Sequence, residues 1–223
     1  MFQETNIGFE YSNDRFLAFF GKHNSTIQNL RSHYPYLDWS WAKQVHGDQL
    51  LEAPVSSDQK ADAQWTRVSG LGLIVMTADC IPVLAVHKPS SVVMAIHAGW
   101  RGVANRIIPK SFQQLQSASE PLTDWQIFIG PHILQFSFEV QNDTLKALAD
   151  SAPLDETEWV NSSNGHYNVD LYKIVVAQMM EVGISESQIQ SLLLDTKTDL
   201  RLHSFRRDKD LSGRQRSFIA LIS

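Results

Sequence analysis

The sequence predicts an α+β protein built on mixed β-sheets. Short apolar runs of strand type alternate along the chain with amphipathic segments of helical period, and neighbouring strand-like runs are joined by turns short enough for hairpins. The chain has 223 residues, of which 43% are hydrophobic and 19% are charged, a composition that can bury a core without disulfides. We therefore expect a single domain over residues 1–223.

The first half of the chain predicts one short helix and a group of strands. Residues 24–35 (NSTIQNLRSHYP) favour a helix that ends at Pro35, because proline cannot continue it. Residues 39–48 (WSWAKQVHGD) indicate a strand that ends in a Gly-Asp turn, and the polar residues 53–66 indicate a loop. The clearest strands follow, the last two joined by a turn at KPSS: residues 70–80, 81–88 and 91–99.

The second half of the chain alternates helices with strands. Residues 99–116 predict a helix that follows a glycine turn and is kinked or delayed by Pro109. The longest apolar stripe lies in residues 169–184, where Gly183 predicts the end of the helix. The other predicted elements are a strand at 125–131, a helix at 141–152, a capped short helix that starts at Ser185 and a final strand at 216–223.

Charge and composition argue against several classes of protein. The net charge of −5 disfavours a general nucleic-acid-binding protein, which needs a basic surface. No run approaches the roughly 18 apolar residues of a membrane span, and residues 1–14 lack the features of a signal peptide. A single cysteine permits no internal disulfide, which suits a cytoplasmic protein. Together with the charge and the lack of a membrane span, we expect no nucleic-acid and no membrane partner.

That single cysteine, Cys80, allows three interpretations. It can be a small core residue, a nucleophile paired with His97, or a metal ligand. If the two strands around KPSS pair, the predicted register places His97 opposite Val83 and Cys80 opposite Trp100. A further candidate, His46, also precedes a glycine. Two imidazoles and one thiolate suit Zn²⁺ and leave its fourth coordination position open.

Several motifs together resemble the YfiH family, also called laccase-domain proteins or polyphenol oxidases. They are KQVHGD, ADAQWT, TADCIPVL, AIHAGWRG and IGPHI…FEV, and the C-terminal SFRRDKDLSGRQ is similar to the family's last signature. The resemblance runs from about residue 41 to the end of the chain. It implies that His46, Cys80 and His97 bind a metal ion. It also implies a layered α/β/β/α fold, related to the catalytic domain of a deamidating bacterial toxin that uses a Cys–His pair.

The family resemblance also implies an enzyme that acts on purine nucleosides. Members are similar to zinc-dependent purine nucleoside phosphorylases, which split adenosine or inosine with phosphate, and to adenosine deaminases. A nucleoside and phosphate are therefore the expected partners. The sequence departs from the family pattern in residues 1–40, where the usual N-terminal motifs are not recognisable, and at Phe138, where the family has tyrosine.

Charged residues near these motifs are candidates for catalysis and binding. The candidate catalytic residues are Asp79, as a proton carrier, and Arg101, whose guanidinium stands at an expected helix start and suits phosphate. Asp62 is the candidate partner that holds a ligand histidine. The candidate substrate- and phosphate-binding residues are the C-terminal arginines Arg206, Arg207 and Arg214.

The same residues leave other functions open. A cysteine-dependent hydrolase would use Cys80 as nucleophile on amide bonds or peptidoglycan precursors, with His97 as base. A non-enzymatic binding module would use zinc for stability, which normally takes four protein ligands. Copper also suits two nitrogens and a sulfur, but a multicopper centre needs about ten histidines, mostly in H-x-H pairs. The eight histidines of this chain include no such pair. The sequence makes no prediction about the oligomeric state.

Overall fold

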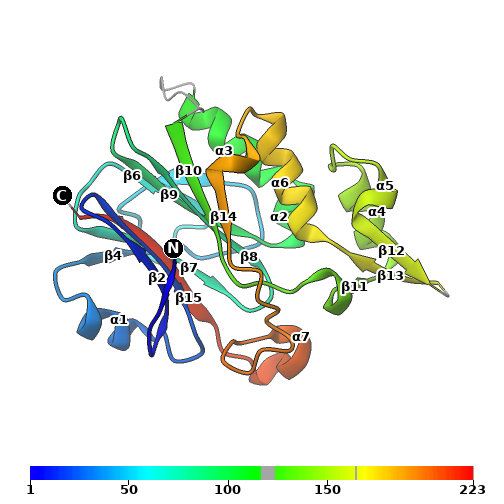
Figure 1. Ribbon diagram of the computed structural model, residues 1–223, viewed down its shortest axis with the longest axis horizontal. Coiled ribbons are helices and arrows are strands. Elements are labelled where there is room, and N and C mark those ends of the chain that lie inside the picture. The colour runs from blue at the N-terminus through cyan, green and yellow to red at the C-terminus, as the bar shows by residue number, and fades with distance from the viewer. Residues whose placement is uncertain (117–123, 164, 223) are drawn as a thin grey trace.

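The computed structural model describes residues 1–116, 124–163 and 165–222. Two β-sheets pack face to face, and helices cover the outer face of each sheet (Figure 1). Helix α1 (Ile27–His33) lies on one outer face. Helices α3 (Ile107–Gln116) and α6 (Leu171–Glu181) lie on the other. The predicted α+β class and its α/β/β/α layering are therefore confirmed.

The first sheet has the spatial order β1 (Gln3–Glu4), β2 (Gly8–Ser12), β3 (Phe16–Gly21), β15 (Gln215–Leu221), β7 (Leu71–Thr77) and β4 (Asp38–Ser40). The C-terminal strand β15 pairs antiparallel with β3 on one side and with β7 on the other. Its side chains alternate, so that Phe218 packs against α1 whereas Ile219 faces the second sheet. This strand is the one predicted at 216–223, of which residue 223 lies outside the described residues.

The second sheet has the spatial order β14 (Ile189–Ser191), β10 (Trp125–Ile129), β8 (Ile81–His87), β9 (Val92–Ala98), β6 (Ala63–Thr66) and β5 (Leu50–Glu52). Strands β8 and β9 form the predicted hairpin, but the predicted register is wrong by one residue. His97 pairs with Pro82 instead of Val83. The shift arises because His87 pairs with Val92, which makes the turn one residue longer than expected.

A smaller sheet and the other helices lie around these layers. The small sheet has the order β11 (Glu139–Val140), β13 (His166–Val169) and β12 (Val160–Ser163), and it lies beside α4 (Asn142–Ala149) and α5 (Glu156–Trp159) (Figure 1). The shorter helices are α2 (Trp100–Ala104), α7 (Phe205–Asp208), and the 3₁₀ turns η2 (Gln135–Ser137), η3 (Glu186–Gln188) and η4 (Lys209–Leu211). In the described ranges, no helix has both the length and the apolarity to cross a membrane.

The predicted helix over residues 99–116 is interrupted, and the interruption lies before Pro109. Helix α2 ends at Ala104, and Arg106 has a φ of 63°, in the left-handed region that ends a right-handed helix. Pro109 instead stands in the first turn of α3, where backbone N–H groups have no partner within the helix. The helices predicted at 24–35, 141–152 and 169–184 are confirmed as α1, α4 and α6.

The region before residue 66 differs most from the prediction. Of the strand expected at 39–48, the structure forms only the start, within β4. His46 therefore lies in a loop and has a φ of 58°, rather than ending a strand. Strand β6 lies inside the segment 53–66 that was expected to be a loop.

Candidate metal and active site

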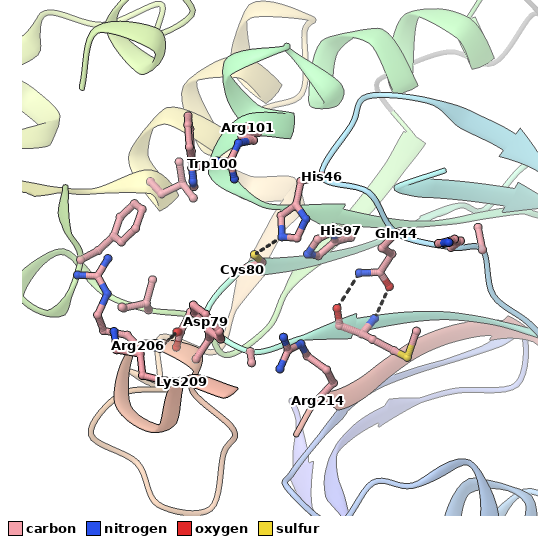
Figure 2. Close-up of a pocket in the computed structure, with 18 of the residues that line it drawn as sticks. Gln44, His46, Asp79, Cys80, His97, Trp100, Arg101, Arg206, Lys209 and Arg214 are labelled. Carbon is pink, nitrogen blue, oxygen red and sulfur yellow. Dashed lines mark hydrogen bonds between the residues drawn. The ribbon is translucent and has the colours of Figure 1, made fainter. Parts of the chain in front are cut away.

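Two histidines and the single cysteine meet at the ends of β8 and β9. His97 belongs to β9, Cys80 directly precedes β8, and His46 lies in the loop between β4 and β5 (Figure 2). Their ligand atoms all lie within 4.8 Å of one another, and Cys80 Sγ is 3.9 Å from His46 Nε2. The structure thus brings the three predicted ligands into one site that can hold a metal ion.

Gly99 makes this meeting possible. A Cβ at this position would lie 2.8 Å from Cδ2 of His46 and 3.1 Å from Sγ of Cys80, and contacts under 3.0 Å are essentially never seen for a Cβ. Because glycine has no side chain, the loop of His46 can close over the strand end that carries His97.

Asp62 holds both histidines in place. The residue is 1% exposed, and Oδ1 accepts hydrogen bonds from the backbone N–H of His46 at 3.0 Å and from Nδ1 of His97 at 2.8 Å. Oδ2 accepts from the backbone N–H groups of Val45 and Gly47 at 3.1 and 2.7 Å. The carboxylate therefore folds the histidine loop and leaves Nε2 of His97 available as a ligand atom.

The site shifts the proton affinities of its members. Burial would raise the pKa of the Cys80 thiol, but the charge of His97 and the hydrogen bonds with both histidines outweigh it and lower this pKa to about 6. Burial would lower the pKa of His97, but Cys80 and Asp62 outweigh it and raise that pKa to about 9. Burial likewise opposes ionisation of Asp62, but the hydrogen bonds from His97 and Gly47 hold its pKa below the usual range. Without a metal, these opposite shifts favour a thiolate on Cys80 and an imidazolium on His97.

The three residues open into a cavity of about 1230 Å³. Aromatic rings line it, namely Trp41, Trp100, Phe138 and Phe205. Cationic side chains also line it, namely Lys43, Arg101, Arg206, Lys209 and Arg214. The carboxylates in the wall are Asp79 and Glu139. Although the whole chain carries a net charge of −5, this wall is cationic and suits an anionic ligand that has an aromatic part.

Three of the predicted arginines, Arg101, Arg206 and Arg214, lie in the cavity wall. The guanidinium of Arg101 lies over the ring of Trp100, 4.4 Å from its centroid. Nη1 of Arg206 donates to the carbonyl of Glu139 at 2.8 Å. In the view of Figure 2, Arg101 lies on one side of the ligand cluster, and Arg206 and Arg214 lie on the other.

Two other predicted residues make different contacts from those expected. Arg207 is not part of the cavity wall, because its guanidinium bonds to Asp208 and to backbone carbonyls of its own loop. Asp79 does line the cavity, but both of its carboxylate oxygens accept hydrogen bonds from the C-terminal segment. The donors are the hydroxyl of Thr196 and the backbone N–H of Arg206.

The sequence prediction missed Lys43, Lys209 and Phe205, which also line the cavity. Lys43 stands three positions before His46 in KQVHGD, and the other two stand in SFRRDKDLSGRQ. Their positions inside these two motifs could have identified them as candidates for the site. Periodicity gives none, because all three are exposed residues without a regular burial pattern.

Comparison with known sequences finds relatives over most of the chain. The family model described as multi-copper polyphenol oxidoreductase laccase matches residues 1–222. A purine nucleoside phosphorylase of Xylella fastidiosa is 32% identical over 182 residues, which cover 78% of this chain and 68% of that protein. The purine nucleoside phosphorylase YfiH of Escherichia coli is 30% identical over 185 residues, which cover 82% of this chain and 73% of that protein.

Solved structures share the fold along the whole chain. The hypothetical protein YfiH of Bacillus licheniformis has a TM-score of 0.89 and 22% identity, and the match covers 99% of this chain and 98% of that one. YlmD of Geobacillus stearothermophilus has a TM-score of 0.90 and 22% identity, with 100% and 99% of the chains covered. The divergent N-terminal segment, residues 1–40, is therefore part of the shared fold.

Proposed function

Because this chain belongs to the YfiH family, as its motifs predicted, we propose that it is a purine nucleoside phosphorylase. Such an enzyme breaks the bond between the purine and C1′ of the ribose and joins C1′ to an oxygen of phosphate. Relatives that are 32% and 30% identical are named for this activity. The proposal rests on one observation, a cavity in which the His46, Cys80 and His97 cluster adjoins cationic and aromatic side chains.

We propose Zn²⁺ as the metal ion of this cluster, and the residues present fit it. Imidazole nitrogen and thiolate sulfur are the ligands that zinc prefers, and Asp62 occupies the second ring nitrogen of His97, as is usual for zinc-binding histidines. Among the described residues the cluster supplies three ligands, whereas a structural zinc ion normally has four. This difference favours an open coordination position over a purely structural module.

The same ligand set argues against a multicopper centre. Two nitrogens and a sulfur also suit copper, but a multicopper centre needs more histidines than this cluster offers. When bound, zinc acts as a Lewis acid that stabilises negative charge on an oxygen of the reactants. The thiol must stay reduced to serve as a ligand, so we place the protein in the reducing cytoplasm.

The chain's own side chains would hold the phosphate and the purine. Arg101 and Arg206 offer forked N–H groups that match phosphate oxygens, and Lys209 and Arg214 add positive charge beside them. The aromatic rings of the wall offer flat apolar faces to the purine. Asp62 keeps His97 oriented throughout the reaction because its hydrogen bond fixes the ring.

Release of the purine base tests the proposal. Zinc-loaded protein incubated with inosine or adenosine and phosphate should give free base and ribose 1-phosphate in equal amounts, measured by chromatography. Omission of phosphate should stop the reaction. The His97→Ala variant should lose both the metal and the activity, whereas His33→Ala, an exposed histidine on α1, should keep both. A folded, zinc-bound protein that releases no base would contradict the proposal.

The arrangement of Cys80, His97 and Asp62 favours a second candidate, a cysteine-dependent hydrolase. The metal-free Cys80 has a pKa of about 6, and Asp62 orients His97 beside it. Such a thiolate would attack an amide carbonyl, and His97 would give its proton to the leaving amine. Water would then hydrolyse the thioester on Cys80, which releases the acid and restores the thiolate. Iodoacetamide should label metal-free Cys80 at neutral pH, and one equivalent of zinc should block the labelling. A phosphorylase loses activity when zinc is removed, whereas the hydrolase would gain activity.

For the same cavity we also propose a further activity, the hydrolytic deamination of adenosine. In this reaction water replaces the 6-amino group, and ammonia is released without phosphate. Ammonia release from adenosine in phosphate-free buffer therefore tests it. If base is released with phosphate but no ammonia forms, the activity is restricted to phosphorolysis.

A further inference from the structure

We propose that Asp79 is a positioning residue, which ties the strand end carrying Cys80 to the C-terminal loop (residues 195–214) and so fixes the cations of that loop in the cavity wall. Hydrogen bonds within the chain, from Thr196 and Arg206 to Asp79, form this connection. The identity of the anion held by those cations, phosphate, rests on the proposed function.

Asp79 has an unusual backbone conformation and uses its whole carboxylate in hydrogen bonds to distant segments. This residue directly precedes Cys80, and its φ of 85° lies in the left-handed region that non-glycine residues rarely adopt. Oδ1 accepts a hydrogen bond from the Thr196 hydroxyl at 2.7 Å, and Oδ2 accepts one from the backbone N–H of Arg206 at 2.6 Å. The Asp79 carbonyl accepts from the N–H of Ile133 at 3.0 Å. Distant segments therefore hold this backbone in place, and both carboxylate oxygens are used in doing so.

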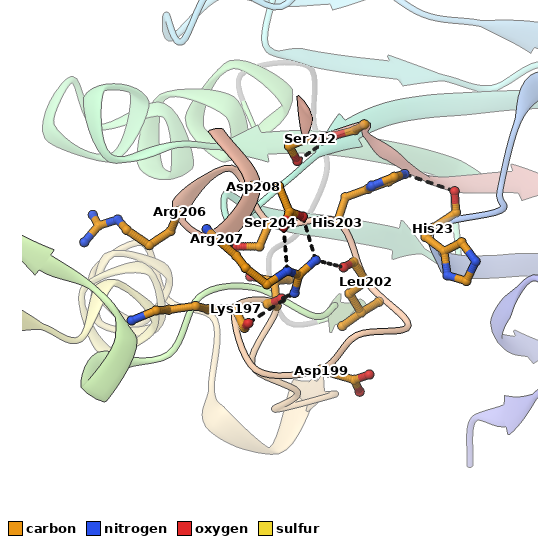
Figure 3. Close-up of polar contacts among 12 residues, drawn as sticks. His23, Lys197, Asp199, Leu202, His203, Ser204, Arg206, Arg207, Asp208 and Ser212 are labelled. Carbon is orange, nitrogen blue, oxygen red and sulfur yellow. Dashed lines mark hydrogen bonds and ion pairs between the residues drawn. The ribbon is translucent and has the colours of Figure 1, made fainter. Parts of the chain in front are cut away.

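Arg207 connects distant parts of the C-terminal loop to one another (Figure 3). The guanidinium of Arg207 donates to the carbonyls of Thr196, Lys197 and Leu202 at 2.9, 3.1 and 2.8 Å. It also pairs with Asp208 through Nε at 2.9 Å and Nη2 at 2.8 Å. A displacement at the end held by Asp79 is therefore transmitted through the loop.

The C-terminal loop contributes four residues to the cavity wall, namely Phe205, Arg206, Lys209 and Arg214. Figure 3 shows the Arg206 side chain pointing away from Arg207. Nη1 of Arg206 donates to the Glu139 carbonyl at 2.8 Å, and the guanidinium lies 5.5 Å from the centroid of the Phe138 ring. Asp79 is covalently next to Cys80 and accepts a hydrogen bond from the backbone N–H of Arg206, so it sets how far the backbone that carries this guanidinium lies from the ligand cluster.

Removal of one donor, with Asp79 itself unchanged, tests the inference. Thr196→Val keeps the shape of the side chain and deletes the hydroxyl. It should raise the KM for phosphate about fivefold or more, while kcat and the KM for the nucleoside change less than about twofold. Asp79→Asn should act in the same direction, because an amide N–H₂ replaces one acceptor. Thr198→Val, an exposed position on the same loop, is the matched control and should behave as the wild type.

Two further measurements separate this inference from the proposed function. Calorimetric titration of zinc-loaded protein with inorganic phosphate should show weaker binding in Thr196→Val than in Thr198→Val at equal zinc content. Hydrogen exchange over residues 195–214 should be faster than in the wild type in Thr196→Val and in Asp79→Asn, but not in Thr198→Val. If the wild type binds no phosphate, the proposed function fails. The hydrogen-exchange rates over residues 195–214 then test by themselves whether Asp79 holds the loop. If KM, affinity and exchange match the control in both variants, the role of Asp79 is overturned.

Discussion

Asp62 shows how one buried residue organises the histidine side of the site. A buried carboxylate is costly unless it is hydrogen-bonded, and this one is satisfied by three backbone N–H groups and by Nδ1 of His97. The backbone donors belong to Val45, His46 and Gly47, so the bonds that satisfy Asp62 also give the loop its conformation. Loop folding and ligand orientation therefore depend on the same two oxygen atoms.

The Asp62→Asn variant should bind zinc about 10- to 100-fold more weakly than the wild type. The amide would present an N–H₂ group to N–H donors, so either a loop bond or the bond to His97 is lost. Competition with a chelating indicator measures the affinity. Asp48→Asn is the matched control. Asp48 lies in the same loop as His46, and its substitution removes only a solvent-accessible ion pair with Lys110 of α3. Equal zinc affinity in the two variants would show that Asp62 does not orient the ligands.

The sequence indicated which residues form the ligand cluster but not how His46 reaches it. The motifs named His46, Cys80 and His97, because a family motif marks residue types at fixed positions. The loop conformation of His46 depends on Asp62, a hydrogen-bond partner distant in the chain that leaves no periodic signal. The sequence also could not predict that the side chains of Arg206 and Arg207 point in opposite directions. Each direction depends on a distant hydrogen-bond acceptor, the Glu139 carbonyl for Arg206 and the Thr196 carbonyl for Arg207.

At the level of elements, the β8–β9 hairpin shows how its turn determines the geometry of the site. His87 pairs with Val92, and the left-handed Ser91, with a φ of 51°, completes the longer turn between them. Continued to the strand ends, this register brings Cys80 opposite Gly99 instead of the tryptophan that follows. A side chain larger than glycine opposite the cysteine would occupy the space of the His46 ring.

Gly99→Ala should therefore lower zinc affinity by at least about tenfold, through displacement of His46 and Cys80. The added methyl would lie 2.8 Å from the His46 ring and 3.1 Å from the sulfur. The backbone of Gly99, with φ −75° and ψ 161°, is open to alanine, so the melting temperature of the metal-free protein should change little. Gly47→Ala is the matched control, because a Cβ there meets its nearest atoms at 3.5 Å. If both variants bind zinc equally, the steric argument fails.

Helices with local end signals were predictable, whereas the N-terminal strands were not. In α6 the apolar stripe lies between the N-cap Asp170 and the left-handed Gly183, and both signals are local. Strand β3 is buried on both faces, so it lacks the alternation that marks a strand with one exposed face. The break between α2 and α3 depends on Arg106, whose left-handed backbone is accompanied by a bond from its side chain to the Ser151 carbonyl at 3.0 Å.

At the scale of the whole molecule, aromatic side chains join the two sheets. Phe128 of β10 lies 5.7, 4.9 and 5.8 Å from the ring centroids of Phe2, Tyr11 and Phe16, which belong to the N-terminal part of the chain. The α+β class follows from local alternation. The stacking of the sheets does not, because it depends on contacts such as that of Phe128 with Tyr11, and local sequence patterns contain no information about such distant partners.

If the sheets are joined through this aromatic layer, truncation at its centre should destabilise the whole fold. Phe128 is 0% exposed, and Phe128→Ala should lower the free energy of unfolding by about 3–5 kcal/mol, as expected for a large cavity between sheets that cannot collapse. Phe136→Ala, at a position 66% exposed, should stay within about 0.5 kcal/mol of the wild type. Urea unfolding of the metal-free proteins measures both. A Phe128→Ala cost below about 1 kcal/mol would mean that the inter-sheet layer is not close-packed and that the stacking depends on other contacts.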